Sequence, residues 1–463
     1  MTNEQLQEIL ALQPADTVKE LKKSSFTIPK WDDLEKQYDP MKHKIWDTTL
    51  YPPKLNENNQ DDFKRTALGL QKLAVARIAQ AMFATPVTRQ YDYDKESEKA
   101  QKAVDILEKV YRTQNFIDSE NIERGKQLNA TCQIATVWKS YEKLSLIEGE
   151  QTKFKLAHTT YSAMDGYEIY AQKDENGELL VVSIGYKDTD NVEWLYVYTN
   201  EEQPKVLVYQ NIKEWELNAE LTNTQLVTFP VVYIPAKEPV WKGDEGTNLV
   251  EQLEEMESYQ GMYIKRNALP TFTLDYGDTT NGANSTTAET SSDSRRIIVV
   301  GKGGGMNDVT WNGAEEAISA RYARIRNAFF EQVQMPDISF ANLINSNTSA
   351  ENKELLFSDA KAKAEDLGGE WEKLFYQEME IVKAFVKVMF PSYATELDLI
   401  SVRSVINPYS VKSKKDNAEY ISLAGDAMSL ETKVRILNEV DDVMQEVEAI
   451  QEKNSADVNQ GIL

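Results

Sequence analysis

The sequence has few of the residues on which metal sites and nucleophilic active sites most often depend. Its 463 residues include one cysteine, Cys132, and two histidines, His43 and His158. A lone cysteine cannot form an intrachain disulfide, and cysteine-based zinc sites and Cys–His catalysis require several such residues in one place. We therefore expect no metal site and no cofactor. Cys132 is predicted to be a small core residue, and His43, in a polar loop, is assigned no role.

Long apolar runs and an export signal are also missing. No stretch approaches the ~18 consecutive apolar residues that read as a membrane-spanning helix. The first residues, MTNEQLQEILALQPAD, are acidic where a signal peptide would be basic and then apolar. We expect a protein outside the membrane, in a reducing cytoplasm or in a particle assembled there.

Positive charge is in deficit, because 51 lysines and arginines face 75 aspartates and glutamates, for a net charge of −24. Tight nucleic-acid binding needs Lys and Arg to neutralise phosphates, so this balance argues against it but allows a surface past which DNA slides. Nucleophile-elbow, dinucleotide and Walker motifs are absent, and the glycine-rich run Val299 to Gly305 lacks the phosphate-loop spacing. Carboxylates are abundant, but no pair stands out as catalytic.

The first half of the chain is predicted to be helical and then β-rich. Helical periodicity predicts helices at Phe63 to Phe83, about Glu96 to Tyr111, and Glu120 to Lys139. From Thr152 to Tyr233 the apolar period changes to two, which predicts strands joined by turns such as Asn176-Gly177.

The rest of the chain is organised around the stretch from Leu249 to Pro391. It predicts a helix at Leu249 to Leu269, a β-hairpin with strands at 271–274 and 297–300 around a polar insert, and a second helix from about Ala314 to Val333. After a polar loop, Thr348 to Glu351 form a capping-box pattern that predicts the start of a long helix reaching Phe390, with a kink at Gly368-Gly369.

Charge along the first of these helices is ordered. Glu251, Glu254 and Glu257 precede Lys265 and Arg266, an order that complements the helix dipole. Two interpretations stay open at this point: a solvated surface, or an acidic channel wall with a basic patch towards one mouth.

The order of these parts resembles the portal protein of tailed bacteriophages, of the long-tailed-phage type. Six segments carry the resemblance: Tyr38 to Ile45, Lys64 to Val87, Phe229 to Ile234 leading to Leu249 to Leu253, Asn347 to Leu356, Ile421 to Thr432, and Asp441 to Val447. The Ser-Gly-x-Ala that often starts the long helix of the family lacks its glycine here.

The resemblance implies an α+β portal fold, mainly helical with a β-rich wing portion. The implied parts are a wing at 1–246, stem helices at 247–269 and 312–335, a clip at 270–311, a tunnel loop at 336–349, a long wing helix at 350–391 and a crown at 392–463. About twelve copies would form a closed ring around a channel for double-stranded DNA. The implied location is the portal vertex of the virion, after assembly in the host cytoplasm.

The implied role is not enzymatic. The ring would serve head assembly, genome packaging, DNA retention and ejection. Its partners would be the major capsid protein, the terminase large subunit, a head-completion or adaptor protein and scaffolding protein, with no membrane. Candidate DNA-channel residues in the tunnel loop are Phe340, Asn342, Leu343, Asn345 and Asn347. Candidate channel residues in the stem are Glu254, Glu257, Lys265, Arg266, Arg321 and Arg324.

Two alternatives remain from the sequence. One is a ring or scaffold protein of another phage-like particle. The other is a soluble enzyme with an acidic two-carboxylate site on the β-rich part, which predicts a monomer or small oligomer with a cleft.

Overall fold

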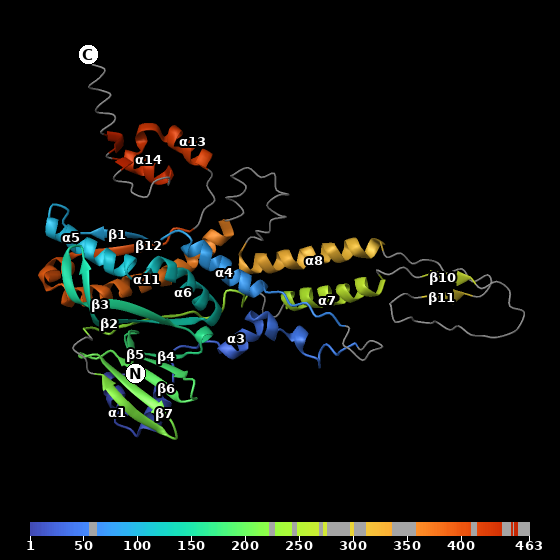
Figure 1. The fold of residues 1–463 in the computed structure, drawn as a ribbon, viewed down its shortest axis with the longest axis horizontal. Helices are drawn as coiled ribbons and strands as arrows, with labels where there is room; N and C mark the ends of the chain where they lie inside the picture. Colours follow the sequence, from blue (N-terminus) through green and yellow to red (C-terminus); the bar gives the residue numbers. More distant parts are fainter. Residues whose placement is uncertain are drawn as a thin grey trace, which may run out of the picture. The chain divides into compact units, whose positions relative to one another are not determined.

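The chain folds as an α+β protein (Figure 1). The computed structural model describes residues 1–54, 63–221, 227–242, 248–267, 272–275, 297–300, 312–335, 358–408, 414–437, 446–447 and 449–451. Contacts divide the chain into two units, the first made of 1–335 with 363–408 and the second of 336–362 with 409–463. Within the described part, no helix is both long enough and apolar enough to cross a membrane.

Three short helices open the first unit: α1 (Asn3–Leu10), α2 (Pro14–Leu21) and α3 (Trp31–Tyr38). A capping box starts α1, since the Thr2 hydroxyl accepts from the Gln5 N–H and the Gln5 side chain accepts from the Thr2 N–H. Leu6 and Leu21 bury one face of this pair against the sheet that follows. Short 3-10 turns lie at Pro40–Lys42, Lys44–Trp46, Ala163–Asp165, Pro391–Tyr393 and Gly425–Ala427.

A helical layer follows, with α4 (Leu70–Phe83), α5 (Glu98–Glu108), a π-helical turn (Lys109–Thr113) and α6 (Ile117–Thr131). The helix predicted from Phe63 begins only at Leu70, because backbone N–H groups of residues 66 and 68 bond to side chains of a distant helix. Gly125 brings α6 close to α4: a Cβ added there would lie 3.1 Å from the Phe83 ring.

The predicted third helix is wrong beyond Thr131. Cys132 ends α6 with a φ of 62°, is fully buried as predicted, and leads into strand β2 (Gln133–Ile147). Residues 134 to 138 are buried on both faces of their strand, so they form an apolar run without the alternation that identifies a half-exposed strand.

Two antiparallel sheets form the β-rich part. β3 (Glu150–Tyr161), β2 and β9 (Val231–Pro235) make a three-stranded sheet in that order. A five-stranded meander runs in order through β4 (Glu168–Lys173), β5 (Leu179–Lys187), β6 (Glu193–Thr199), β7 (Lys205–Asn211) and β8 (Trp215–Leu221). The predicted turn at Asn176-Gly177 is confirmed, with Gly177 at φ 86°.

The long helix α11 (Ser358–Met389) packs on the helical layer, where Trp371 and Phe375 contact Phe83 by their rings. It continues through Gly368 and Gly369 as one helix. The predicted capping box at 348–351 lies outside the described residues. α12 (Ala394–Leu399) and β12 (Ser401–Val405) follow, and β12 pairs antiparallel with β1 (Thr88–Asp92).

The two helices predicted around the polar insert are confirmed as α7 (Leu249–Asn267) and α8 (Asn312–Val333). They lie side by side and run in opposite directions (Figure 1). The strands between them, β10 (Phe272–Asp275) and β11 (Ile297–Val300), are paired in parallel, so the predicted hairpin is wrong. A tight hairpin needs a short connection, whereas the 21 residues of 276–296 are enough for the chain to return in the same direction.

In the second unit the described part includes α13 (Lys414–Ala424) and α14 (Leu430–Leu437). Gly425, at φ 50°, follows α13 as the predicted C-terminal glycine. The Ser429 hydroxyl accepts from the Thr432 N–H and caps α14, as the Ser429-Leu-Glu-Thr sequence predicts.

Candidate functional site

The antiparallel pair α7 and α8 is the part of the first unit that the sequence singled out as functional. α7 buries a stripe at helical spacing that includes Val250, Leu253 and Met262. α8 buries Phe329 and Val333 near its C-terminal end. Each helix therefore has one face fixed inside the subunit and another face exposed.

Two polar side chains, Glu254 and Ser258, lie within the buried stripe of α7. Glu254 is 2% exposed, and its Oε1 lies 2.5 Å from Nδ1 of His43, which is itself 6% exposed. The same Oε1 accepts from the backbone N–H of Leu68 at 2.7 Å. One carboxylate thus joins α7 to two separate segments of the N-terminal region.

Further bonds extend this attachment. The Ser258 hydroxyl accepts from the Thr66 N–H at 2.9 Å, and Lys44 forms an ion pair with Glu251 at 2.9 Å. We call His43, Lys44, Glu251, Glu254 and Ser258, together with the backbone of residues 66 and 68, the α7 anchor. Because its bonds come from segments on both sides of residues 55–62, the anchor fixes two loop segments to one helix.

The hydrogen-bond partners of His43 define its protonation state. Its Nε2 lies 2.8 Å from the carbonyl of Gln37, and its Nδ1 faces the Glu254 carboxylate. Opposite an ionised Glu254 both partners are acceptors, so this geometry favours the imidazolium form, in which both ring nitrogens donate. Burial lowers the pKa of His43, but the hydrogen bond and the charge of Glu254 outweigh burial and raise the pKa above its ordinary value.

The C-terminal end of α8 is held by aromatic and cationic contacts. The Phe329 and Phe330 rings pack edge to face with centroids 5.4 Å apart. The guanidinium of Arg77, on α4, lies 5.1 Å from the Phe330 ring centroid. These contacts therefore join the C-terminal end of α8 to the helical layer.

A second buried polar cluster fixes α11. Glu378 is fully buried and accepts from Arg124 at 2.8 and 3.3 Å, from the Tyr111 hydroxyl at 2.9 Å and from the Trp138 indole at 3.1 Å. Arg124, also fully buried, donates to Thr136 at 3.1 Å. We call these five residues the Glu378 cluster. It ties α11 to α6, to the π-helical turn and to β2.

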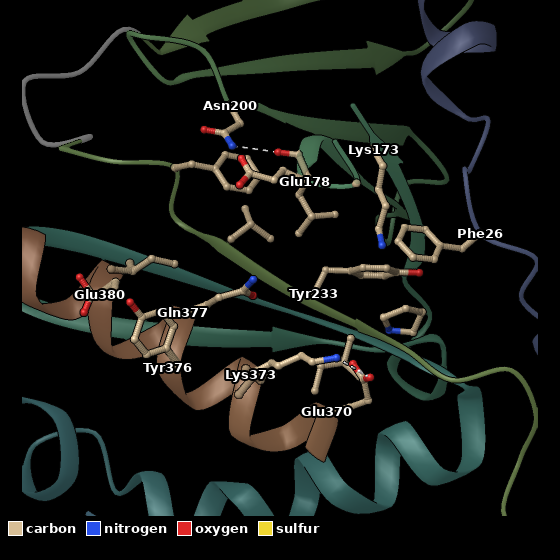
Figure 2. A pocket seen from close by; sticks show the side chains of 18 residues that line it. Phe26, Lys173, Glu178, Asn200, Tyr233, Glu370, Lys373, Tyr376, Gln377 and Glu380 are labelled. Atoms are coloured by element: carbon tan, nitrogen blue, oxygen red, sulfur yellow. Dashed lines mark hydrogen bonds and ion pairs between the residues drawn. The ribbon is translucent and has the colours of Figure 1, made fainter. Parts of the chain in front are cut away.

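A cavity of about 550 Å³ lies between α11 and the β-rich part (Figure 2). The Lys173 ammonium lies 4.6 Å from the Phe26 ring centroid at one side. Three carboxylates line the cavity: Glu370 pairs with Lys373 at 2.9 Å, Glu380 pairs with a lysine one helical turn on, and Glu178 lies just before β5. The two carboxylates on α11 are neutralised along their own helix, which does not match a two-carboxylate catalytic site.

The predicted stem residues occupy different environments. Glu257 is half-buried, and Arg321 and Arg324 are exposed on α8. Glu254 is buried and bonded inside the subunit, which leaves it no surface to present to a channel, so we remove Glu254 from the candidate set. The side chains of Lys265 and Arg266 lie outside the described residues. The five tunnel-loop candidates, Phe340, Asn342, Leu343, Asn345 and Asn347, also lie outside them.

The sequence reasoning missed His43. Its partner Glu254 is 211 positions away, so no local pattern joins them. A usable signal was the place of Glu254 on the apolar stripe of α7, between Leu253 and Met262, because a carboxylate on a buried face needs a partner. Within the described residues, no group of three or more His, Cys, Asp or Glu side chains is arranged to hold a metal ion.

A family model described as phage portal protein, SPP1 Gp6-like, matches residues 21–460, which is nearly the whole chain. No curated protein matches the chain.

Proposed function

Because the chain belongs to the SPP1 Gp6-like family of phage portal proteins, we propose that about twelve copies of it close into a ring with a central channel for double-stranded DNA. The family is structural and not enzymatic, so the alternative of an acidic two-carboxylate enzyme is wrong. The protein is a portal vertex protein of the virion capsid, with a part in genome packaging and in the head–tail connection.

We propose that α7 and α8 are the stem helices. The observation that carries this proposal is that each has one face packed inside the subunit and an exposed face left over. On α8 the exposed face combines small side chains, such as Ala320 and Ala323, with Arg321 and Arg324. Small side chains allow a neighbouring helix to approach closely, and an arginine at intervals supplies weak contact with a phosphate backbone.

If α7 and α8 are the stem helices, then residues 270–311 form the clip, residues 336–349 form the tunnel loop and residues 350–391 form the long wing helix. β12 pairs with β1 of the first unit, so we place the end of the wing at Pro408 and propose the crown within 409–463. The candidate channel set becomes Glu257, Lys265, Arg266, Arg321 and Arg324 with the five tunnel-loop residues. We propose that Phe340 to Asn347 reach into the channel.

An acidic subunit suits this role. A lining of mostly negative charge repels phosphate and lets DNA move, and a few positive side chains limit its free diffusion, with both effects weakened by salt. Major capsid protein, terminase large subunit, an adaptor and scaffolding protein are the proposed partners, met during assembly in the host cytoplasm.

Native mass spectrometry of the purified protein, with negative-stain images of the same sample, tests the ring. We expect a mass close to twelve times the 52.7 kDa of the chain and a central hole. A dimer or tetramer without a hole, in the presence of scaffolding protein as well as alone, would contradict the proposal.

The tunnel loop and the stem can be tested separately in assembled particles. Deleting residues 340–346 is expected to reduce packaging or DNA retention. Replacing Arg321 and Arg324 together by glutamine is expected to change the salt dependence of packaging, with Arg403→Gln on β12 as the matched control. Unchanged packaging and retention in the deletion variant would remove the role of the loop.

A further inference from the structure

A further cavity, of about 370 Å³, lies in the first unit between the three-stranded sheet and the five-stranded meander. Side chains alternate along a strand, so residues two apart point to the same face of their sheet. Val137 and Lys139 on β2 therefore point the same way, as do Tyr196 and Tyr198 on β6. Val137 and Tyr198 belong to one buried cluster, so the two sets face each other across the space between the sheets. We call this hollow the intersheet cavity.

Tyrosine rings dominate the walls of the intersheet cavity. The ring centroids of Tyr161 and Tyr167 lie 4.8 Å apart, those of Tyr167 and Tyr186 lie 5.7 Å apart, and those of Tyr186 and Tyr196 lie 6.1 Å apart. These four rings form a continuous row, and Tyr198 is a fifth tyrosine in the lining. Aromatic rings pack favourably against one another in offset and edge-to-face arrangements, so such a wall favours a ligand that carries an aromatic ring.

The Tyr198 hydroxyl is a buried polar group in this wall. Its side chain is 8% exposed, and the hydroxyl forms no hydrogen bond with a described residue. It is not among the unpartnered polar atoms that the fold closes off from solvent, so a ligand in the cavity can reach it. Burial raises the pKa of Tyr198 above its ordinary value, so the hydroxyl keeps its proton at pH 7 and can donate. A buried hydroxyl without a partner is costly and indicates an acceptor that the isolated chain does not supply.

The charge of the intersheet cavity comes from Lys139. This side chain is exposed, so it marks the mouth of the cavity, and it forms no ion pair with a described residue. No described residue of the lining is acidic, and the tyrosines are neutral at pH 7: burial, and then the charge of Tyr196, raises the pKa of Tyr186 to about 12. On a chain with a net charge of −24, the mouth is therefore a local positive site that favours an anion.

The size of the intersheet cavity suits a small organic molecule. Small-molecule sites have volumes of roughly 300–1,000 Å³ and mostly apolar walls with a few polar groups that fix the orientation of the ligand. Here one polar group, Lys139, lies at the exposed mouth and another, Tyr198, is buried, with aromatic walls around them. A matching ligand has a carboxylate at one end, an aromatic ring in the middle and a hydrogen-bonding group at the other end.

We propose that the intersheet cavity binds a small phenolic carboxylate. The carboxylate is neutralised by Lys139, the ring packs against the row of tyrosines, and the phenol oxygen accepts a hydrogen bond from the Tyr198 hydroxyl. The lining residues all belong to the first unit of one chain, so this site does not depend on the proposed ring.

Saturation-transfer NMR titrations of the purified full chain at low salt test the proposal with three probes. The first is 3-(4-hydroxyphenyl)propionate, for which we expect saturable binding. The second, 3-phenylpropionate, lacks the hydroxyl and should bind about five-fold more weakly, the loss of one neutral hydrogen bond. The third, tyramine, has an ammonium in place of the carboxylate and should bind at least ten-fold more weakly. Absence of saturable binding of the first probe, or equal binding of tyramine, overturns the proposal.

Lys139→Met tests the source of the charge preference. The substitution keeps most of the side-chain length and removes the charge, so the preference for the carboxylate over tyramine should be largely lost. Lys153→Met, at an exposed lysine of β3 outside the cavity, is the matched control and should keep that preference. Equal behaviour of the two variants overturns the proposal.

Tyr198→Phe tests the buried end of the cavity, because it removes the hydroxyl and keeps the ring. This variant should bind the two propionates equally. Tyr170→Phe, which removes a hydroxyl that donates to Glu168 outside the cavity, is the control and should keep the five-fold preference. A preference that persists in Tyr198→Phe contradicts the proposed contact. Circular dichroism and thermal midpoints confirm that each variant is folded.

Discussion

The α7 anchor and the Glu378 cluster each neutralise a buried glutamate, but with different cations. In each, a buried glutamate on a long helix is neutralised by a residue that lies far away in sequence, and further donors complete its hydrogen bonds. The Glu378 cluster uses Arg124, which stays charged at any pH that a protein experiences. The α7 anchor uses His43, whose charge can be lost near neutral pH. We therefore expect the attachment of α11 to be independent of pH near neutrality and the attachment of α7 to depend on it.

The largest expected effect comes from removing the permanent cation. Arg124→Met leaves Glu378 buried and uncompensated, which should lower the free energy of unfolding by about 3–5 kcal/mol. Urea denaturation at pH 7 measures this loss. The conservative partner variant Glu378→Gln, which removes the charge and retains part of the hydrogen bonding, should lose less; an equal loss in both would contradict a mainly electrostatic role.

A smaller loss of stability is expected when the cation of the α7 anchor is removed. His43→Gln keeps one donor but removes the charge opposite Glu254, and hydrogen bonds to charged groups contribute about 1.5–3 kcal/mol. The free energy of unfolding at pH 6 should fall by that order. Lys42→Gln, a nearby exposed cation, is the control; a comparable loss there would mean that the effect is not specific to the buried pair.

The two clusters should differ most clearly in how their contributions to the free energy of unfolding depend on pH. The folded-state pKa of His43 is raised, so its stabilising contribution is fully present below about pH 6.5 and is lost as pH rises through the folded-state pKa. The stability difference between wild type and His43→Gln should therefore shrink from pH 6 towards pH 8.5. His158, with its pKa lowered to about 4, has the opposite sign and cancels in this difference.

The same titration applied to the double variant Arg124→Met/Glu378→Gln, which removes both charges of the cluster, provides the contrast. Its difference from the wild type should stay nearly constant from pH 6.5 to 8.5, because an arginine does not lose its charge in this range and no unpaired buried carboxylate is left in the variant. Parallel curves for the two variants would remove the distinction between the sites.

The smallest predicted change is Ser258→Ala. It leaves the Thr66 N–H without its acceptor at the edge of the α7 anchor, a loss of about 1 kcal/mol. Hydrogen exchange of the Thr66 amide should report it even where global stability barely changes. Unaltered protection of that amide would show that the bond adds little to the anchor.

Much of the fold could be predicted because its signals are local. α7 and α8 show helical spacing of apolar residues, and β5 to β7 are short runs rich in Val, Ile and aromatic residues with turn sequences between them. Gly425 and Ser429 mark helix ends by their own chemistry. β2 was missed because its first half is buried on both faces and carries no alternation. The direction of β11 was missed because a long insert places no constraint on the direction in which the chain returns.

The candidate site was less predictable, since its bonds are long-range. Arg124 and Glu378 are 254 positions apart, and His43 and Glu254 are 211 apart. Each glutamate sits beside apolar positions of its helix, which signals a buried carboxylate but not the identity of its partner. In the sequence of one chain, residues that are buried against another subunit cannot be told apart from residues that are buried within the subunit.

The burial of Cys132 has a practical consequence for labelling. It is the single cysteine of the chain, it is fully buried, and burial raises the pKa of its thiol to about 12. Only the thiolate attacks a maleimide, so the folded protein should react with such reagents as if it contained no cysteine. A cysteine introduced at an exposed position such as Arg321 would then carry one fluorophore or spin label per subunit, and the distances between labels across an assembled particle could be measured without altering any native residue elsewhere.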